Sequence, residues 1–305
     1  MENSLFIGNG LNLTLDNYSW DNLLKIVADY VGTEPVAGIP LPLEFERLMN
    51  VKLSRNPGLK DKDGIYSKAK ARAISPLKLL GLEGNPVHNL LKELPCDSII
   101  TTNYDFMLEK VFNPNFSSKE SNELYCDYKT SVFGDIGFYH PHGSVASTRS
   151  ICLGYEHYVK LLNHIRNEMD ANSISSILDN HINIECKWYH KFFTDNVYIF
   201  GFGLSESEID IWSLITKRAS LYYRDKSGLQ SRIANTITYY EIINDIEKDP
   251  HSYISKLALL EAEHVEVRRR YLSEYKNDGD SIKEAYKKAY TNIIADISEE
   301  IQCQD

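Results

Sequence analysis

The sequence contains few cysteines, and no two of them lie close together. The 5 residues stand at Cys96, Cys126, Cys152, Cys186 and Cys303, so no C-x-x-C pair occurs. This spacing argues against a thiolate zinc site, and the odd number does not indicate a disulfide framework. We therefore predict free thiols in a reducing compartment, a cytoplasmic location and no bound metal.

Long hydrophobic runs are absent as well. No stretch reaches the roughly 18 apolar residues that indicate a membrane span, and the opening sequence MENSLFIGNG is not typical of a signal or transit peptide. Basic residues are fewer than acidic ones, with 33 Lys and Arg against 43 Asp and Glu and a net charge of −10. We therefore expect no membrane association and no direct binding to nucleic acid.

The rest of the composition is typical of a folded protein with a substantial core. Hydrophobic residues make up 43% and charged residues 25% of the 305 residues. A chain of this length is compatible with two domains of about 150 residues or with one large α/β domain. Disordered and fibrous classes are excluded, whereas the kind of function stays open.

Local patterns predict alternating strands and helices. Apolar and β-branched runs predict strands over residues 5–7, 98–102, 137–140, 196–200, 236–243 and 265–267. Helical periodicity follows a possible cap at Ser19 and recurs near 106–112, between 155 and 193, and over 281–301. This alternation predicts an α/β fold, a Rossmann-like doubly wound and mostly parallel sheet with helical insertions.

The same patterns suggest how the chain is divided. We predict a single Rossmann-like domain over residues 1–305, without an internal repeat. Residues 33–92 and 145–195 are predicted to be helical insertions that form a second lobe, and residues 281–305 a C-terminal helix. The extra length would then cover a crevice of the sheet domain.

Polar clusters follow four of the predicted strands. They are GNG at residues 8–10, TTNYD at 101–105, HPHGS at 140–144 and GFGLSESEID at 201–210. In a doubly wound sheet a ligand binds beyond the carboxyl ends of the strands, so this topology would gather the four clusters along one crevice. Their convergence is the main functional signal in the sequence.

The first cluster has two interpretations. Gly8 and Gly10 between a strand and a helix allow backbone N–H groups to approach a phosphate, or they serve a tight turn that needs positive φ. The third glycine of a G-x-G-x-x-G motif is replaced by Leu13, and no acidic residue ends a second strand about 20 residues later. A conventional dehydrogenase is therefore disfavoured.

The second cluster places an uncharged amide after a strand. Asn103, preceded by Thr101 and Thr102, can both donate to and accept from ribose hydroxyls or an attacking water. On local grounds alone, Asn103 or Asp105 would simply cap the helix that begins near Phe106.

The third cluster holds two histidines one residue apart. His140 and His142 lack a carboxylate or cysteine at matching spacing, so a metal site is disfavoured. We interpret His140 as structural. His142, followed by Gly143 and Ser144, is a candidate general base because imidazole titrates near neutral pH and glycine leaves room for a ligand.

The fourth cluster repeats the junction of strand, glycine and helix. Ser205 is a candidate N-cap, and Glu208 three residues later completes a capping box. The glycines and the free N–H groups of the helix could also hold the adenosine half of a dinucleotide, with Glu206, Glu208 and Asp210 as candidates for ribose hydroxyls.

Taken in this order, the four clusters resemble those of the sirtuin-like superfamily, particularly the bacterial sirtuin-like proteins of anti-phage defence. GNGLN with Trp20 resembles the first glycine loop and helix, TTNYD the asparagine motif, HPHGS the catalytic-histidine motif, and GFGLSESEID the later glycine loop. The motifs are spread over nearly the whole chain. The two C-x-x-C pairs of the deacetylase zinc ribbon are absent, and Leu41-Pro42-Leu43 follows Gly38-Ile39-Pro40 where Asp-Phe-Arg would stand.

The resemblance implies an NAD⁺ hydrolase that cleaves the nicotinamide–ribose bond, with NAD⁺ as substrate and Asn103 and His142 as catalytic residues. It implies NAD⁺ contacts from thirteen further residues, Gly8, Asn9, Gly10, Asn12, Thr101, Thr102, Asp105, Gly143, Gly201, Gly203, Leu204, Ser205 and Asp210. It also implies an effector of anti-phage defence that acts by NAD depletion and is gated by homo-oligomerisation or by a separately encoded ATPase or sensor. The alternatives are a non-catalytic module that senses NAD⁺ or ADP-ribose, and an NAD-dependent deacylase.

Overall fold

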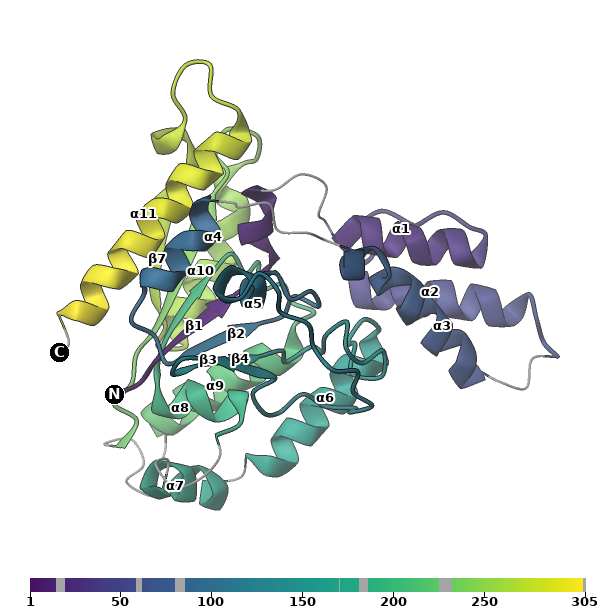
Figure 1. Ribbon diagram of the computed structural model, residues 1–305, viewed down its shortest axis with the longest axis horizontal. Coiled ribbons are helices and arrows are strands. Elements are labelled where there is room, and N and C mark those ends of the chain that lie inside the picture. The colour runs from purple at the N-terminus through teal and green to yellow at the C-terminus, as the bar shows by residue number, and fades with distance from the viewer. Residues whose placement is uncertain are drawn as a thin grey trace.

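The computed structural model describes residues 1–14, 20–58, 62–79, 86–169, 171–180, 186–224 and 232–303. Its centre is one seven-stranded sheet with the strand order β3-β4-β2-β1-β5-β6-β7 (Figure 1). The strands are β1 (Asn3–Ile7), β2 (Ser98–Thr101), β3 (Ser131–Phe133), β4 (Ile136–Tyr139), β5 (Asn196–Phe200), β6 (Ile237–Ile243) and β7 (Glu266–Tyr271). The structure confirms the predicted α/β, Rossmann-like fold.

All neighbouring strands are parallel except the edge pair β3–β4. The chain leaves the central strand β1 toward β2 on one side, and later returns to β5 on the other side of β1. The strand order therefore reverses at β1, and a crevice is expected beyond the carboxyl ends of β1 and β5. Both strands end there in glycine loops, at Gly8 and at Gly201.

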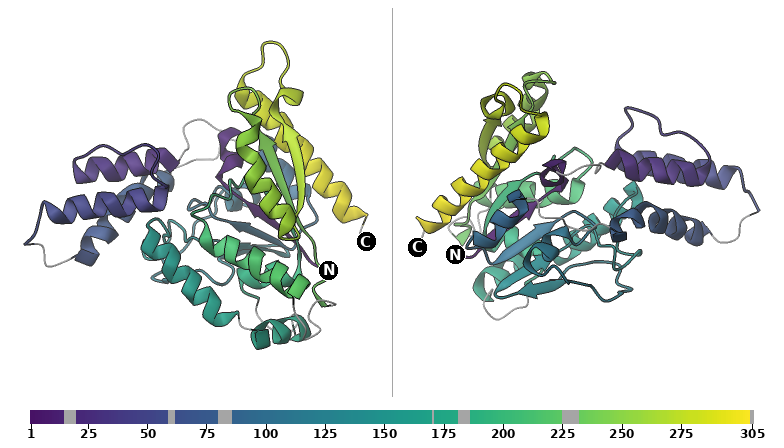
Figure 2. Two further views of the ribbon diagram at one scale, coloured as in Figure 1. Left: turned by 180° about the vertical axis from the view of Figure 1, so that it is seen from behind. Right: turned by 45° about the horizontal axis from the view of Figure 1, so that its top comes forward.

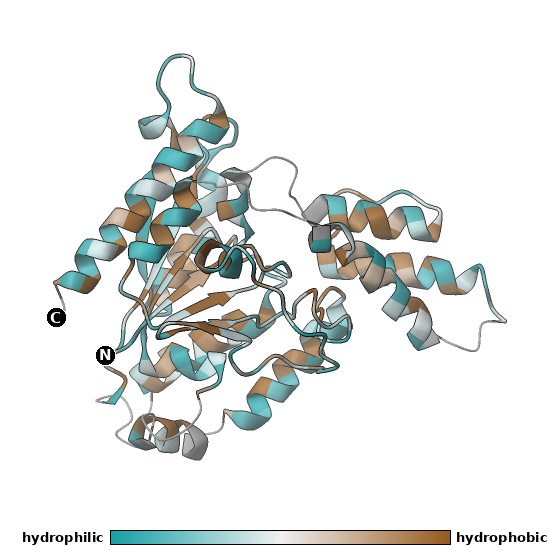
Figure 3. Cartoon of the chain, viewed as in Figure 1, coloured by the Kyte–Doolittle hydropathy of each residue, from teal (hydrophilic) through white to brown (hydrophobic). Residues whose placement is uncertain are grey.

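Helices cover both faces of the sheet. The α-helices are α1 (Trp20–Val31), α2 (Leu41–Ser54), α3 (Lys62–Ile74), α4 (Pro86–Leu90), α5 (Met107–Phe112), α6 (Tyr155–Glu168), α7 (Ala171–Asn180), α8 (Lys191–Thr194), α9 (Ile209–Arg224), α10 (Ile254–Ala262) and α11 (Ile282–Gln302). Side chains alternate along β1, so Phe6 faces the helices α6, α8 and α9, while Leu5 and Ile7 face α4 and α11. The apolar strands accordingly lie in the middle of the molecule (Figure 3).

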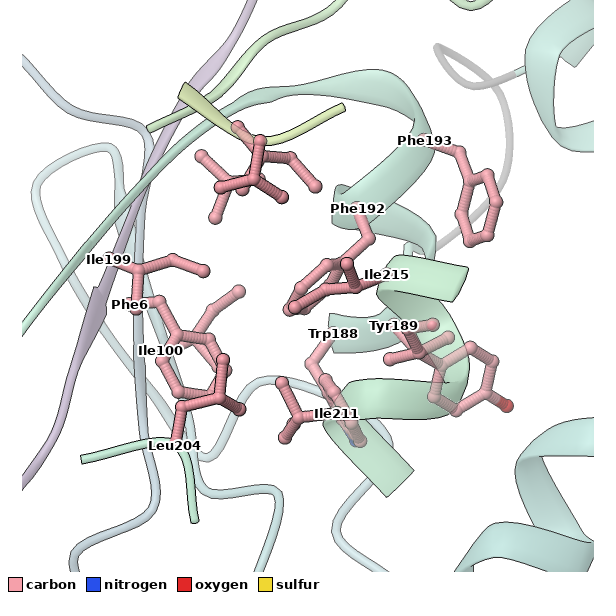
Figure 4. Close-up of a cluster of buried hydrophobic side chains, with 14 of the residues drawn as sticks. Phe6, Ile100, Trp188, Tyr189, Phe192, Phe193, Ile199, Leu204, Ile211 and Ile215 are labelled. Atoms are coloured by element: carbon pink, nitrogen blue, oxygen red, sulfur yellow. The ribbon is translucent and has the colours of Figure 1, made fainter. Parts of the chain in front are cut away.

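The core between the sheet and helices α6, α8 and α9 is rich in aromatic side chains. Phe6, Ile100 and Ile199 project from β1, β2 and β5 toward Trp188 and Phe192 (Figure 4). The rings of Phe6 and Phe192 meet edge to face with centroids 5.9 Å apart. Ile211 and Ile215 of α9 close the same cluster, which fixes α9 and the loop before it against the sheet.

Helices α1, α2 and α3 form a lobe beside the sheet (Figures 1 and 2). Their hydrophobic core also includes Tyr104, Ile151 and Leu153 from the sheet body. The lobe meets the sheet body through α2 and α6, where Glu46 Oε1 accepts from the backbone N–H of Glu156 at 3.2 Å. A Cβ atom on Gly154 would lie 2.7 Å from Cδ1 of the buried Phe45 ring, so glycine permits this close contact.

The elements differ from the sequence prediction in a few places. Strand β3 was not predicted, and β7 extends to Tyr271. The insertion predicted over residues 33–92 does not match the lobe. Helix α1 begins at Trp20, before this range, and packs on α2 and α3, whereas α4 lies within the range but packs on α11. The proposed cap at Ser19 lies outside the described residues. The division of the chain into a domain with two insertions stays a prediction.

Candidate active site

A cavity of about 480 Å³ opens at the carboxyl ends of β1, β5 and β6. This volume lies within the roughly 300–1,000 Å³ typical of small-molecule sites. Residues from three of the four polar clusters line it, together with residues of α2, α6, α10 and α11. The lining relevant here comprises Asn9, Gly10, Leu41, Pro42, Thr102, Tyr158, Gly201, Gly203, Ser205, Glu208, Glu241, Lys248, Tyr253, Lys256, Tyr286 and Tyr290.

The two glycine loops pack directly on each other. Gly8 N–H donates to Phe200 O at 3.1 Å, and Gly10 N–H donates to Gly201 O at 2.6 Å. A Cβ atom on Gly8 would lie 2.4 Å from Gly201 O. Only Gly201 of these three has positive φ, at 62°. Gly8 and Gly10 therefore serve close backbone approach, and the interpretation as a turn with positive φ is wrong for both.

Asn12 connects the first loop to a helix behind it. Its Nδ2 donates to Asn9 Oδ1 at 3.0 Å, and its Oδ1 lies 3.0 Å from His88 Nε2. Burial lowers the pKa of His88 to about 4. The ring is therefore neutral at pH 7, and its Nε2–H can donate to Asn12. Asn12 is itself buried, so it orients Asn9 at the cavity wall.

The TTNYD cluster follows β2 and is held by local hydrogen bonds. Thr101 Oγ1 donates to Ile7 O at 2.7 Å and accepts from Asn103 N–H at 3.1 Å. Asp105 Oδ1 accepts from the N–H of Met107, the first residue of α5, at 2.9 Å, but the N-cap of this helix is Phe106 and neither Asn103 nor Asp105. Burial raises the pKa of Asp105. Thr102 lines the cavity. Asn103, the next residue in the sequence, is buried, with 7% of its surface exposed.

His140 is fully buried, and both of its ring nitrogens are occupied. Nδ1 lies 2.8 Å from Asn103 O, and Nε2 lies 2.7 Å from Glu109 Oε1. Burial alone would lower the pKa of His140, but the Glu109 carboxylate outweighs it and raises the pKa. His140 therefore ties Asn103 to α5.

His142 is equally buried but has only one occupied nitrogen. Nε2 lies 2.9 Å from Asp210 Oδ2 at the start of α9. Nδ1 has no hydrogen-bond partner among the residues that the structure describes. Tyr158 of α6 packs edge to face on the ring with centroids 5.0 Å apart. Since Tyr158 lines the cavity, His142 lies one side chain behind its wall.

Gly143 and Leu204 shape the loops around these residues. Gly143 has a φ of 87°, and a Cβ atom there would lie 2.3 Å from Ser150 O. Leu204 is buried in the aromatic core at a φ of 44°. Both residues position backbone, and neither lines the cavity among the residues described.

The loop before α9 places one carboxylate in the cavity wall. Glu208 Oε2 accepts from Ser205 N–H at 2.5 Å, while Ser205 Oγ contacts Ser207 Oγ at 2.7 Å. The sequence suggested Ser205 as the N-cap of this helix. That prediction is wrong, because α9 begins at Ile209. Burial raises the pKa of Glu208 to about 7, although the His142 ring and the Ser205 N–H favour the charged form.

Sequence reasoning missed the far end of the cavity. There Lys256 Nζ donates to Glu241 Oε2 at 2.5 Å and to Gly203 O at 3.0 Å. Tyr286 and Tyr290 reach the same end from α11. Glu241 was the one available signal, since a carboxylate within the apolar strand 236–243 needs a partner. Tyr286 and Tyr290 lie on one face of α11, and tyrosines at this helical spacing are equally typical of a buried core. Their sequence pattern therefore does not indicate a cavity.

Two features are absent from the part of the chain that the structure describes. No group of three or more His, Cys, Asp and Glu side chains suited to a metal ion was found there. No described helix has both the length and the apolar character that crossing a membrane requires.

Residues 97–222 match the family model of the SIR2-like domain. The match runs from β2 through α9 and includes Asn103, His142 and Asp210, whereas the first glycine loop, β6 and α11 lie outside it. No curated protein matches the chain. The domain match supports a sirtuin-like, NAD-related function.

Proposed function

We propose that this chain, which belongs to the sirtuin-like superfamily through its SIR2-like domain at residues 97–222, hydrolyses NAD⁺ to nicotinamide and ADP-ribose. One observation carries the proposal. A cavity of suitable size lies at the strand ends, where Thr102, Tyr158 and Glu208 line the wall. Asn103 follows Thr102 in the chain, and the ring of His142 packs on Tyr158. An uncharged amide and a histidine with a free nitrogen are the groups suited to directing water at a sugar carbon.

The cavity has two chemically different ends. Tyr158 and Glu208 lie near His142. Tyr253, Lys256 and Tyr286 line the cavity from α10 and α11 or from residues next to them. The nicotinamide ribose is therefore assigned to the first end and the adenosine to the second. Because the N–H groups of Gly8 and Gly10 donate within the protein, those glycines support the site by allowing the two loops to pack closely.

In the proposed reaction, water adds to C1′ of the ribose as the bond to nicotinamide breaks, and one proton is released. Charge develops on the ribose in the transition state, so the site must exclude bulk water and align the nucleophile. Asn103 would orient the water or the ribose hydroxyls. His142 would accept the proton from that water or from a ribose hydroxyl. Neutral nicotinamide leaves without further help.

We also propose that the activity is gated. Unrestricted NAD⁺ hydrolysis harms the cell that makes the enzyme, and His142 lies behind Tyr158 in this structure. An effector of anti-phage defence that depletes NAD⁺ after a homo-oligomer forms, or after a separate ATPase or sensor binds, fits this arrangement. A purified chain that is strictly monomeric and fully active would contradict the gating proposal.

The test measures nicotinamide, ADP-ribose and cyclic ADP-ribose after incubation with NAD⁺, with and without candidate activators. Replacing Asn103 or His142 by alanine is expected to reduce nicotinamide release by about 10²–10⁴-fold. Undiminished release in either variant would remove that residue from the mechanism. Binding of NAD⁺ without consumption under all conditions would favour the alternative of a non-catalytic sensor. Release that requires an acyl-lysine peptide would favour a deacylase.

A further inference from the structure

We infer that Asp210 is a positioning residue that fixes the proton of His142 on Nε2 and leaves Nδ1 as the nitrogen that accepts a proton. The inference deepens the proposed function and rests on it for the direction of proton transfer. It also changes the role of Asp210, for which the sequence suggested contact with a ribose hydroxyl. In the structure Asp210 is 0% exposed and does not line the cavity among the residues described.

The hydrogen bond itself determines the tautomer. An ionised carboxylate only accepts hydrogen bonds, so the nitrogen that faces Asp210 must carry a proton. That nitrogen is Nε2, at 2.9 Å from Asp210 Oδ2. When the ring is neutral, its lone pair is therefore on Nδ1, which is buried and has no partner within the described chain. A buried acceptor without a partner is costly, and a donor O–H at this position would satisfy it.

The neighbouring pair His140–Glu109 provides an internal comparison. Its ring is also fully buried and lies 2.7 Å from a carboxylate, so the two pairs have the same chemistry. However, His140 also binds Asn103 O through Nδ1 at 2.8 Å. With both nitrogens occupied, His140 can accept no further proton without breaking a contact. Of these two dyads, only His142–Asp210 retains a free nitrogen.

The groups that face His142 raise the pKa of its ring, so the ring is neutral only above that pKa. Asp210 from α9 and Glu208 from the preceding loop raise the pKa of His142 above its ordinary value, and burial opposes them. Tyr158 from α6 is uncharged, because burial raises its pKa well above the ordinary value. Cys152, which faces Asp210, is uncharged for the same reason, since its pKa is also raised.

The first measurement needs no variant. Nitrogen NMR of the histidine-labelled full chain, above the pKa of His142, reports which ring nitrogen carries the proton. We expect a protonated Nε2 on His142 in the wild-type protein, and a protonated Nδ1 would overturn the inference whether or not the chain cleaves NAD⁺. The wild-type spectrum therefore separates failure of this inference from failure of the proposed function.

The second measurement uses Asp210→Asn, whose amide can donate to Nε2 and draw the proton to Nδ1. We expect kcat to fall by about 10²–10⁴-fold with little change in KM, as in other dyads that lose the correct tautomer. In the wild type, kcat/KM should increase with pH as His142 loses its proton. In Asp210→Asn this increase should occur at lower pH, because without the carboxylate burial dominates and lowers the pKa of His142. A ribose contact would instead raise KM with kcat preserved, and that result would overturn the inference.

Two further variants control for neighbouring effects. Glu109→Gln breaks the matched pair at His140 and should leave both the tautomer of His142 and the midpoint of the pH profile unchanged. Glu208→Gln removes the carboxyl group whose pKa is about 7, so the midpoint that remains is assigned to His142. If Glu109→Gln shifts the His142 tautomer as much as Asp210→Asn does, Asp210 has no special role.

Discussion

Replacing Gly10 by alanine is expected to destabilise the protein by about 1–3 kcal/mol, the usual range for a group forced into a packed interior. The added Cβ atom would lie 2.7 Å from Gly201 O, 2.7 Å from Tyr290 Oη and 2.9 Å from Gly201 Cα. All three distances are below the 3.0 Å that real Cβ atoms essentially never cross. Two of the contacts are backbone atoms, so a rotamer change cannot relieve them.

Gly203→Ala is the matched control for this prediction. No heavy atom lies within 4 Å of a Cβ at Gly203, and its φ is outside the positive region. Its stability should stay within about 0.5 kcal/mol of the wild type. The Tyr290→Phe change, combined with Gly10→Ala, removes one of the clashing atoms and should restore only part of the loss. The free energy of unfolding of the wild type, the two single variants and the double variant is measured in urea, with the m-value unchanged. Equal midpoints for Gly10→Ala and Gly203→Ala would refute the argument.

Three other predictions concern single side chains. Glu208 is uncharged below its pKa of about 7, so ADP-ribose, an anion, should bind more tightly at pH 6 than at pH 8, and calorimetry should show that Glu208→Gln removes this dependence. A thiol reagent should modify Cys303 first, because it is the exposed one of the 5 cysteines, and Cys303→Ser should abolish the fast phase. Replacing the fully buried Trp188 by alanine should cost about 3–5 kcal/mol in thermal or urea unfolding, and a loss below 1 kcal/mol would contradict its place in the core.

The sequence was sufficient for the sheet because its strongest strands are buried on both faces. Runs such as Val197 to Phe200 are continuous in apolar residues, and the glycines that end them identify the carboxyl edge. Strand β3 escaped prediction because Ser131–Phe133 is a short, half-exposed edge strand with no such pattern. Its register depends on the antiparallel partner Ile136–Tyr139.

The site was predictable as a set of clusters but not as a set of contacts. Nothing local to HPHGS distinguishes His140 from His142, since their partners Glu109 and Asp210 lie 31 and 68 residues away. The same limit applies to Gly10, where a side chain is excluded by the close approach of Gly201 and Tyr290. Contacts between distant segments decide these roles, and one segment read alone contains neither partner.

The packing of the last helix on the first loop has a consequence for how the protein is made. The cavity takes residues from Asn9 to Tyr290, and the central strand β1 pairs with β5 near residue 200. At a synthesis rate of roughly 5–20 residues per second, β1 waits on the order of 10–40 seconds for that partner. A ribosome-bound chain therefore has no complete cavity until α11 has emerged, so a nascent copy cannot yet bind a ligand across the whole cavity.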